Sequence, residues 1–328
     1  MAQPIARVAL FCFAAGSTFW TASGAAAEAA PANYPARPIR FIVPSSPGGG
    51  TDITARLIAA RLTERLGQQV IIDNRPGAAG SIGTELAARA APDGHSLLAF
   101  AATAVATAAT RKNLPYDLTR DFTPVTQTTS LPYLLVTHQS LAVKTVNDLV
   151  ALARAKPGSL TYGSSGTGGL SHLAGGLLAQ LTDTNLVHVP YKGGAPALAD
   201  VLAGRISMLF SSPLQAGTHL RSGKLRALAV TTRTRLSRMP ELPTMIEAGL
   251  PNYEVNVWNG IIGPAGIPGA IVNKLFLETA QVLQGLKGQL AADGSEVVAS
   301  PPHAFGVYIK SEVAKWRKTV EQIGLRLE

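Results

Sequence analysis

Short apolar runs alternate with longer amphipathic stretches along most of this chain. Residues 39–44, IRFIVP, form a β-rich apolar run that predicts a buried strand. Over residues 52–66 the apolar positions recur at helical spacing, and Gly67 follows as a typical C-terminal cap. Two further strands and an intervening helix are predicted at residues 69–74, 95–100 and 80–94. This order predicts an α/β fold with parallel strands joined by crossover helices.

A second series of strands and helices follows residues 121–132, to which the pattern assigns no element. Strands are predicted at residues 133–138, 160–166, 186–193, 206–212 and 225–232, and helices at 146–158, 171–181 and 195–203. A proline-rich segment, residues 238–254, then leads to the apolar segment VWNGIIGPAGIP, residues 257–268, and to two C-terminal helices, the last over residues 304–323. Two α/β lobes joined by more than one crossing of the chain are the simplest architecture.

The N-terminal 29 residues have the pattern of a secretory signal peptide. Arg7 precedes the apolar run from Val8 to Trp20, and small residues follow, with cleavage expected after Ala27 or Ala29. A membrane anchor is the alternative, but the apolar run is shorter than the ~20 residues that span a bilayer. Export to the periplasm is therefore expected.

The mature chain is expected to contain no cysteine. Cys12 is the single cysteine, and it lies inside the expected signal peptide. Disulfides, cysteine zinc sites and cysteine nucleophiles are therefore excluded from the exported protein.

Composition indicates a compact globular protein with an excess of positive charge. Hydrophobic residues make up 46% and charged residues 15%, while 29 basic and 20 acidic residues give a net charge of +9. Such an excess favours anionic ligands or envelope surfaces. Nucleic acid is the competing explanation, but the basic residues are spread singly and an exported protein seldom meets DNA. Nucleic acid is not an expected partner.

The loop after the first predicted strand is rich in glycine. Gly48, Gly49 and Gly50 allow a ligand close to the backbone, and the helix that follows directs unpaired N–H groups and a partial positive charge outward. Such a loop suits a carboxylate or a phosphate. No lysine stands where a phosphate-binding P-loop needs one, and the dinucleotide pattern fails because Ile53 stands at its last glycine.

Three further strand ends carry hydroxyl groups and glycines. Ser165 and Thr167 follow the strand near residue 162, but the nucleophile pattern G-x-S-x-G is one position out of register, so a catalytic serine is not expected. These hydroxyls are alternatively turn or helix-cap residues. Tyr191, Ser211 and Ser212 follow two later strands. The side chains at these strand ends include few titratable groups, so they favour binding an anion over transforming it chemically.

The histidines show no metal-binding spacing. They stand at positions 95, 138, 172, 188, 219 and 303, without an H-x-x-x-H or H-E-x-x-H pairing. His172 begins a helix, where it either orients the loop, faces a ligand or packs as a structural residue. We expect no metal, no cofactor and no enzyme activity.

Many segments resemble the Bug family, the extracytoplasmic solute receptors of tripartite tricarboxylate transporters. They include YPARPIRFIVPSSPGGGTDITARL, KPGSLTYGSSGTGGLSHLAG, LVHVPYKGGAPALADVLAGRISMLF and LPTMIEAGLP, in the same order over essentially the whole mature chain. The resemblance implies a type II periplasmic-binding-protein fold whose two lobes close by hinge motion on a small carboxylate. It implies a first lobe of residues 30–128 and 230–328, a second lobe of residues 129–229, a monomeric receptor and membrane permease subunits as partners.

The resemblance also implies a set of ligand-binding positions. Those of the first lobe are Ser46, Gly48, Gly49, Asp52, Ala102 and Thr103. Those of the second lobe are Ser165, Thr167, Gly168, His172, Tyr191, Ser211 and Ser212.

Two positions depart from the common family pattern. Ser211 stands where many relatives have an aspartate, which suits an ammonium, so a carboxylate or dicarboxylate without an amine is expected. Ser45 stands where an aromatic residue is common, which predicts a roomier and more polar rim. A receptor that signals to a sensor protein instead of a permease is an open alternative, and an envelope hydrolase is a remote one.

Overall fold

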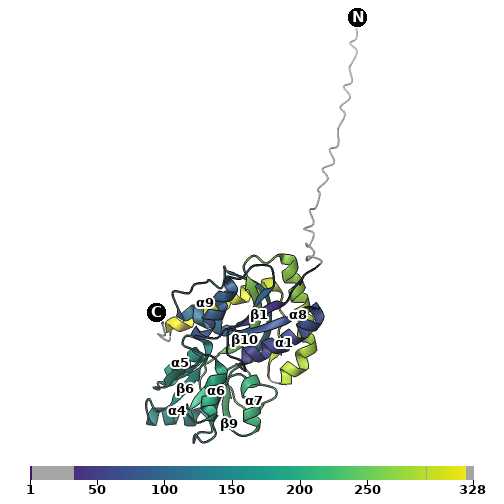
Figure 1. Ribbon diagram of the computed structural model, residues 1–328. Helices are drawn as coiled ribbons and strands as arrows, with labels where there is room; N and C mark the ends of the chain where they lie inside the picture. The colour runs from purple at the N-terminus through teal and green to yellow at the C-terminus, as the bar shows by residue number, and fades with distance from the viewer. Residues whose placement is uncertain (2–32, 293, 323–328) are drawn as a thin grey trace.

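The computed structural model describes residue 1, residues 33–292 and residues 294–322. The expected signal peptide, residues 1–29, lies outside the described residues except for Met1. Two mixed sheets, each covered by helices on both faces, form two lobes of an α/β fold (Figure 1). No helix in the described part of the chain has both the length and the apolar character needed to cross a bilayer.

The first lobe is built on a six-stranded sheet with the order β11-β4-β10-β3-β1-β2. These strands are β1 (Ile39–Val43), β2 (Val70–Asn74), β3 (Ser96–Ala101), β4 (Phe122–Pro132), β10 (Asn256–Pro264) and β11 (Glu296–Val297). Strands β1, β2 and β3 are parallel, as expected, whereas β10 is antiparallel to β3 and β4. The sheet is therefore mixed, because β10 brings the chain back from the other lobe and enters from the opposite end.

Helices cover both faces of this first sheet. They are α1 (Gly50–Leu66), the short η1 (Ala78–Gly80), α2 (Ser81–Ala88), α3 (Ala102–Thr110), α8 (Gly269–Ala292) and α9 (Pro302–Gln322). Phe41 points into the core beneath α1 and α8, and its neighbour Ile42 points into the core on the opposite face beneath α3 and α9. This alternation follows from the two-residue period of a strand.

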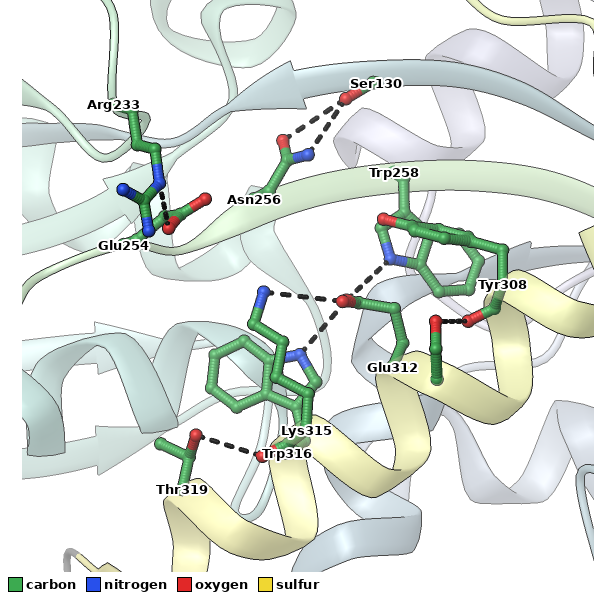
Figure 2. A network of polar contacts seen from close by, with 11 residues as sticks. Ser130, Arg233, Glu254, Asn256, Trp258, Tyr308, Glu312, Lys315, Trp316 and Thr319 are labelled. Carbon is green, nitrogen blue, oxygen red and sulfur yellow. Dashed lines mark hydrogen bonds and ion pairs between the residues drawn. The ribbon is translucent and has the colours of Figure 1, made fainter.

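Helix α9 is fastened to β10 by a buried carboxylate. Glu312, which is 6% exposed, accepts hydrogen bonds from the indole N–H groups of Trp258 at 3.2 Å and Trp316 at 3.3 Å. Figure 2 shows Glu312 between the two indole rings, with Lys315 as its ion-pair partner at 3.4 Å. One carboxylate thus satisfies two buried donors that a purely apolar contact would leave unpaired.

The second lobe has a five-stranded sheet with the order β7-β6-β8-β5-β9. Its strands are β5 (Leu134–His138), β6 (Thr161–Ser164), β7 (Val187–Pro190), β8 (Met208–Ser211) and β9 (Leu225–Val230). Its helices are α4 (Val146–Ala155), α5 (Leu170–Thr182), α6 (Gly194–Leu202) and α7 (Pro213–Arg221). Strand β5, which enters from the first lobe, is antiparallel to both of its neighbours.

Two crossings connect the lobes, and Thr231 ties them together. The chain leaves the first sheet after Pro132 and returns to it before Asn256. Thr231 donates its backbone N–H to the carbonyl of Tyr133 at 3.0 Å and its hydroxyl to the carbonyl of Val255 at 2.6 Å. These crossings have the character of a hinge, since a single residue, Tyr133, separates β4 from β5 and the two crossings are hydrogen-bonded side by side at Thr231. The lobe limits named above, at residues 128–129 and 229–230, stay a prediction.

Several elements differ from the sequence-based expectation. Residues 121–132, left without an element, are mostly the long strand β4, and α3 and α7 had no predicted counterpart. Helix α3 has the sequence ATAVATAAT, in which small apolar and threonine residues leave no clear polar face. Its burial between the lobes explains that composition, since nearly every side of the helix is covered.

Candidate functional site

A cavity lies between the lobes, at the ends of strands from both sheets. It encloses about 860 Å³ of empty space, part of it open to solvent. Ser45, Thr103 and Asn259 line it from the first lobe, and Ser165, Ser212 and Gln215 from the second. Among the described residues, none with a charged side chain lines this cavity.

Four helices of nine or more residues begin at the cavity without a capping side chain; the shorter α2 also begins there, at Gly80, but its first N–H, that of Ser81, is taken by the carbonyl of Ala78. The N-cap residues are Gly49 for α1, Ala101 for α3, Gly169 for α5 and Gly193 for α6, and none of these helices has a side-chain cap within the described structure. The first turn of such a helix has N–H groups with no partner in the helix itself. Because two of these helices come from each lobe, their partial positive charges converge on the cavity from both sides.

Helix α7 is the contrasting case, because it carries its own cap. The Ser212 hydroxyl accepts a hydrogen bond from the backbone N–H of Gln215 at 3.3 Å. That bond fixes the first turn of α7, which places Gln215 at the cavity wall.

Several buried polar atoms around the cavity lack a partner. Ser45 Oγ, Gln215 Nε2 and Asn259 Oδ1 are shielded from solvent and make no hydrogen bond to any described atom, and all three residues line the cavity. Ser46 Oγ, in the residue next to Ser45, is also shielded from solvent and without a hydrogen-bond partner. Buried polar groups in native proteins are nearly always paired, so this cluster indicates a place where a polar ligand belongs.

Asp52 organises the glycine loop of the first lobe from behind. Its carboxylate accepts hydrogen bonds from Gly48 N at 2.8 Å, Asn74 Nδ2 at 2.8 Å and Arg56 Nε at 2.9 Å. Burial opposes ionisation, but these bonds and the Arg56 charge outweigh it and hold the pKa of Asp52 below its usual value. The carboxylate is therefore neutralised within the loop and is turned away from the cavity.

Two stacked histidines support the glycine loop of the second lobe. The His172 and His188 rings lie 3.7 Å apart and nearly parallel. His172 Nδ1 accepts the backbone N–H of Gly168 at 3.0 Å. His188 Nε2 lies 2.6 Å from Ser164 Oγ, which in turn accepts the backbone N–H of Gly166 at 3.1 Å. His172 therefore acts as an acceptor that shapes the loop, which requires a neutral ring, and His188 supports the loop through Ser164.

Acid should destabilise the protein through this histidine pair. Burial lowers the pKa of His172 to about 4, and burial together with repulsion from His172 lowers the pKa of His188 to about 4. Unfolded histidine binds its proton near pH 6.5, so between pH 6.5 and 4 the unfolded state holds more protons than the folded state. The free energy of unfolding therefore decreases as the pH is lowered through this range. We expect His188→Gln to flatten this fall in guanidinium unfolding measured at pH 7.5, 5.5 and 4.5.

The exposed His303 offers a matched control for that measurement. His303→Gln makes the same substitution outside the pair, and its pH profile is the reference against which that of His188→Gln is compared. Identical pH profiles for His188→Gln and the wild type would contradict the assigned role of the histidine pair.

The structure distributes the predicted site residues over three places. Gly49, Thr103, Ser165 and Ser212 line the cavity. Ser46, Thr167 and Tyr191 line a groove just outside it. Gly48, Asp52, Ala102, Gly168, His172 and Ser211 line neither; of these, Gly48 is exposed and the others are buried. Binding by any of these residues stays a prediction.

Ser211 does not line the cavity itself but contacts Gln215, which does. It is 2% exposed, and its hydroxyl faces Gln215 Oε1 at 3.4 Å. In that position it orients the Gln215 amide, whose nitrogen is unpaired at the cavity wall. Tyr191 likewise has a partner elsewhere, since its hydroxyl donates to Asp200 Oδ2 at 2.6 Å.

Gln215 and Asn259 are cavity residues that the sequence analysis missed. Gln215 lies in the first turn of α7, after the β8 strand end, so the rule that ligands meet strand ends pointed to its neighbourhood. Asn259 lies within β10, where the sequence carries no such signal.

The lobes touch one another at their glycines. A Cβ atom placed on Gly50 of the first lobe would lie 2.6 Å from Ser212 Oγ of the second. A Cβ on Gly166 would lie 2.9 Å from the backbone nitrogen of Ala79, and Gly193 packs directly against Ser46. Close approach of the two lobes thus depends on positions without side chains. Among the residues that the structure describes, no group of three or more His, Cys, Asp or Glu is placed to hold a metal ion.

Comparisons with known proteins agree with this architecture. The family model described as "Tripartite tricarboxylate transporter family receptor" matches residues 54–325. BugT of Bordetella pertussis is 33% identical over 315 residues, which cover 94% of this chain and 96% of BugT.

Two solved structures have the same fold. A protein of R. palustris, solved with adipate, is 36% identical with a TM-score of 0.85 and covers 89% of this chain and 98% of its own. MatC from Rhodopseudomonas palustris, solved with bound malate, is 31% identical with a TM-score of 0.84. The match covers 87% of this chain and 99% of the MatC chain. The chain therefore belongs to the tripartite tricarboxylate transporter receptor family, the TctC or Bug periplasmic solute-binding proteins, which are receptors and not enzymes.

Proposed function

We propose that this protein is exported to the periplasm, captures a small organic carboxylate without an amine, and delivers it to a membrane permease. The observation that carries the proposal is the convergence of four uncapped helix N-termini, two from each lobe, on one cavity without charged side chains in the described structure. Unpaired N–H groups and positive helix ends stabilise a carboxylate. An ammonium group would meet no carboxylate in the same lining.

Neutral donors complete the proposed site. The Ser45 hydroxyl and the Gln215 amide offer hydrogen bonds that no described atom accepts. These donors would replace the water molecules that a carboxylate loses when it enters the cavity. Asn259 Oδ1 needs a donor, which a ligand hydroxyl or an ordered water would supply. The adipate and malate bound by two relatives belong to the same chemical class.

The proposed mechanism is hinge closure around the ligand. The open form would expose the helix ends of both lobes, and closure would bring Gly50 against Ser212 and Gly193 against Ser46. A ligand drives closure only as far as it binds the closed form more tightly. The closed form is then the one that a permease would recognise.

The test is calorimetry and thermal unfolding with a panel of small acids. The protein is first unfolded and refolded to remove any co-purified ligand. A matching carboxylate at 100 times its Kd should stabilise the protein by about 2.7 kcal/mol. We expect the diamide of the same acid and the corresponding α-amino acid to give no stabilisation, because one lacks the negative charge and the other adds an ammonium. Stabilisation by the diamide as large as that by the acid would contradict anion capture.

A further inference from the structure

Three buried polar atoms without a partner lie around the start of α2 in the first lobe. They are Ser81 Oγ, Tyr116 Oη and Arg111 Nε, each shielded from solvent and without a hydrogen bond to any described atom. Ser81 is 8% exposed and Tyr116 is 6% exposed, so both side chains are buried as a whole. Buried polar groups in native proteins are nearly always paired, so this cluster indicates a place where a polar partner binds.

The fold brings the three residues together from separate segments. Ser81 is the first residue of α2, Arg111 directly follows α3, and Tyr116 belongs to the connection between α3 and β4. The end of α3 packs on the turn that precedes α2, since Thr107 Oγ1 donates to Ala79 O at 3.3 Å. Arg111 is fixed to the same end of α3, because its backbone N–H donates to Thr107 O at 3.1 Å.

The phenol of Tyr116 faces the other members of the cluster. Burial raises the pKa of Tyr116, and the hydroxyls of Ser81 and Thr84 together with the positive charge of Arg111 act against that rise. Thr84 is already engaged, because its hydroxyl donates to Gly80 O at 2.9 Å. Two hydroxyl donors and one guanidinium N–H therefore share one buried place.

No carboxylate compensates Arg111 within the part of the chain that the structure describes. Arg111 takes part in no ion pair there, and the nearby Glu85 is held by Arg89 at 2.6 Å. A water molecule would satisfy the two hydroxyls but would leave the guanidinium charge uncompensated. An anion would accept the hydrogen bonds and also balance the charge, and hydrogen bonds between charged groups and donors are the stronger ones.

The same place adjoins a strained turn of the backbone. Ala78 and Ala79 have φ angles of 47° and 54°, which are left-handed values that residues with a Cβ atom rarely adopt. Such a turn persists only where its surroundings hold it. Ala79 also meets the second lobe, because a Cβ atom on Gly166 would lie 2.9 Å from its backbone nitrogen. A group bound at Ser81 would therefore support the surface on which the second lobe packs.

We propose that Ser81, Tyr116 and Arg111 form a buried site for a small monovalent anion such as chloride, which holds the turn before α2 in place. The burial of all three donor atoms favours a monatomic ion over sulfate or phosphate. Ser81 and Tyr116 line neither the cavity nor the groove beside it, so the site is independent of the carboxylate proposed for the cleft.

Anomalous diffraction from crystals soaked in sodium bromide tests the site directly. We expect a bromide peak in contact with Ser81 Oγ, Tyr116 Oη and Arg111 Nε. Tyr116→Phe removes one donor and keeps the ring that packs edge-on against Phe122 at 6.1 Å, so it should abolish the peak without loss of the fold. Density at this place without an anomalous signal would identify a water molecule and overturn the proposal.

Urea unfolding with and without sodium bromide tests the site in solution. At a bromide concentration ten times its Kd, the equilibrium constant for unfolding of the wild type should fall about tenfold. Tyr116→Phe and Arg111→Gln should lose this response. The buffer contains no carboxylate and no other halide, so that neither the cleft nor chloride contributes.

Two matched controls separate the site from general effects of salt. Tyr34→Phe removes a buried hydroxyl that donates to Gly94 O at 2.8 Å, and Arg238→Gln removes an exposed cation elsewhere. Both should keep the wild-type response to bromide. Equal responses of the wild type and all four variants would show that bromide acts only by screening, and would overturn the buried anion site.

Discussion

Gly50→Val should weaken ligand binding roughly ten- to hundredfold while the fold is kept. Gly50 is the first residue of α1, and a Cβ atom there would lie 2.6 Å from Ser212 Oγ and 3.3 Å from Ser212 Cβ, across the cleft. Overpacking of this kind costs about 1–3 kcal/mol, and here the cost falls only on the closed form. The ligand then has to supply that free energy from its own binding. Calorimetry gives the Kd, and guanidinium unfolding without ligand reports on the fold.

Gly269 provides a matched control for Gly50. It is the first residue of α8, and a Cβ atom added there meets nothing within 4 Å. Gly269→Val should leave the Kd unchanged, although it makes the same chemical change at the same helix position. Equal affinities for Gly50→Val and the wild type would show that binding does not require the lobes to close as observed.

Glu312→Ala should lower the free energy of unfolding by about 3–5 kcal/mol. The carboxylate is almost wholly buried and serves the indole N–H groups of Trp258 and Trp316 (Figure 2). Its removal leaves two buried donors without an acceptor and a cavity between β10 and α9. Both tryptophans lie at the change, so their fluorescence during guanidinium unfolding reports on this region directly.

Two further variants test whether burial is the cause. Glu312→Gln keeps an acceptor oxygen and should cost clearly less than Glu312→Ala. Glu254→Ala removes an ion pair to Arg233, whose side chain is 75% exposed, and should cost less than about 1 kcal/mol. If Glu254→Ala lowered the free energy of unfolding as much as Glu312→Ala, burial would not be the cause, since surface and buried carboxylates would then contribute equally.

Local sequence patterns predicted most elements and the α/β class. The strand at residues 39–44 and the helix ending at Gly67 are confirmed by β1 and α1, because hydrophobic period and capping act over neighbouring residues. Helix α3 and strand β4 were not predicted, because their sequences lack such a local pattern. Their small and threonine residues carry no period of their own and take their structure from the lobes around them.

The candidate site was predictable where glycines and hydroxyls follow strands. Gly49, Ser165 and Ser212 lie at the cavity as their positions after β1, β6 and β8 indicated. His172 and Asp52 lie behind the loops, because their hydrogen bonds to backbone N–H groups turn them away from the cavity. Asn259 was not predictable, since no local rule marks one residue of a buried strand as facing a cavity.

The sequence by itself determined most of the elements, their order and the loops whose glycines let a ligand approach the backbone, because these depend on residues close together in the chain. Only the tertiary structure decided which loops face one another, that four uncapped helices share a cavity, and that residues of both lobes line the groove beside it. Arg111 and Lys192, which line that groove from opposite lobes, lie 81 positions apart in the chain. Contacts of that range are set by the packing of whole sheets and helices, and no local pattern encodes them.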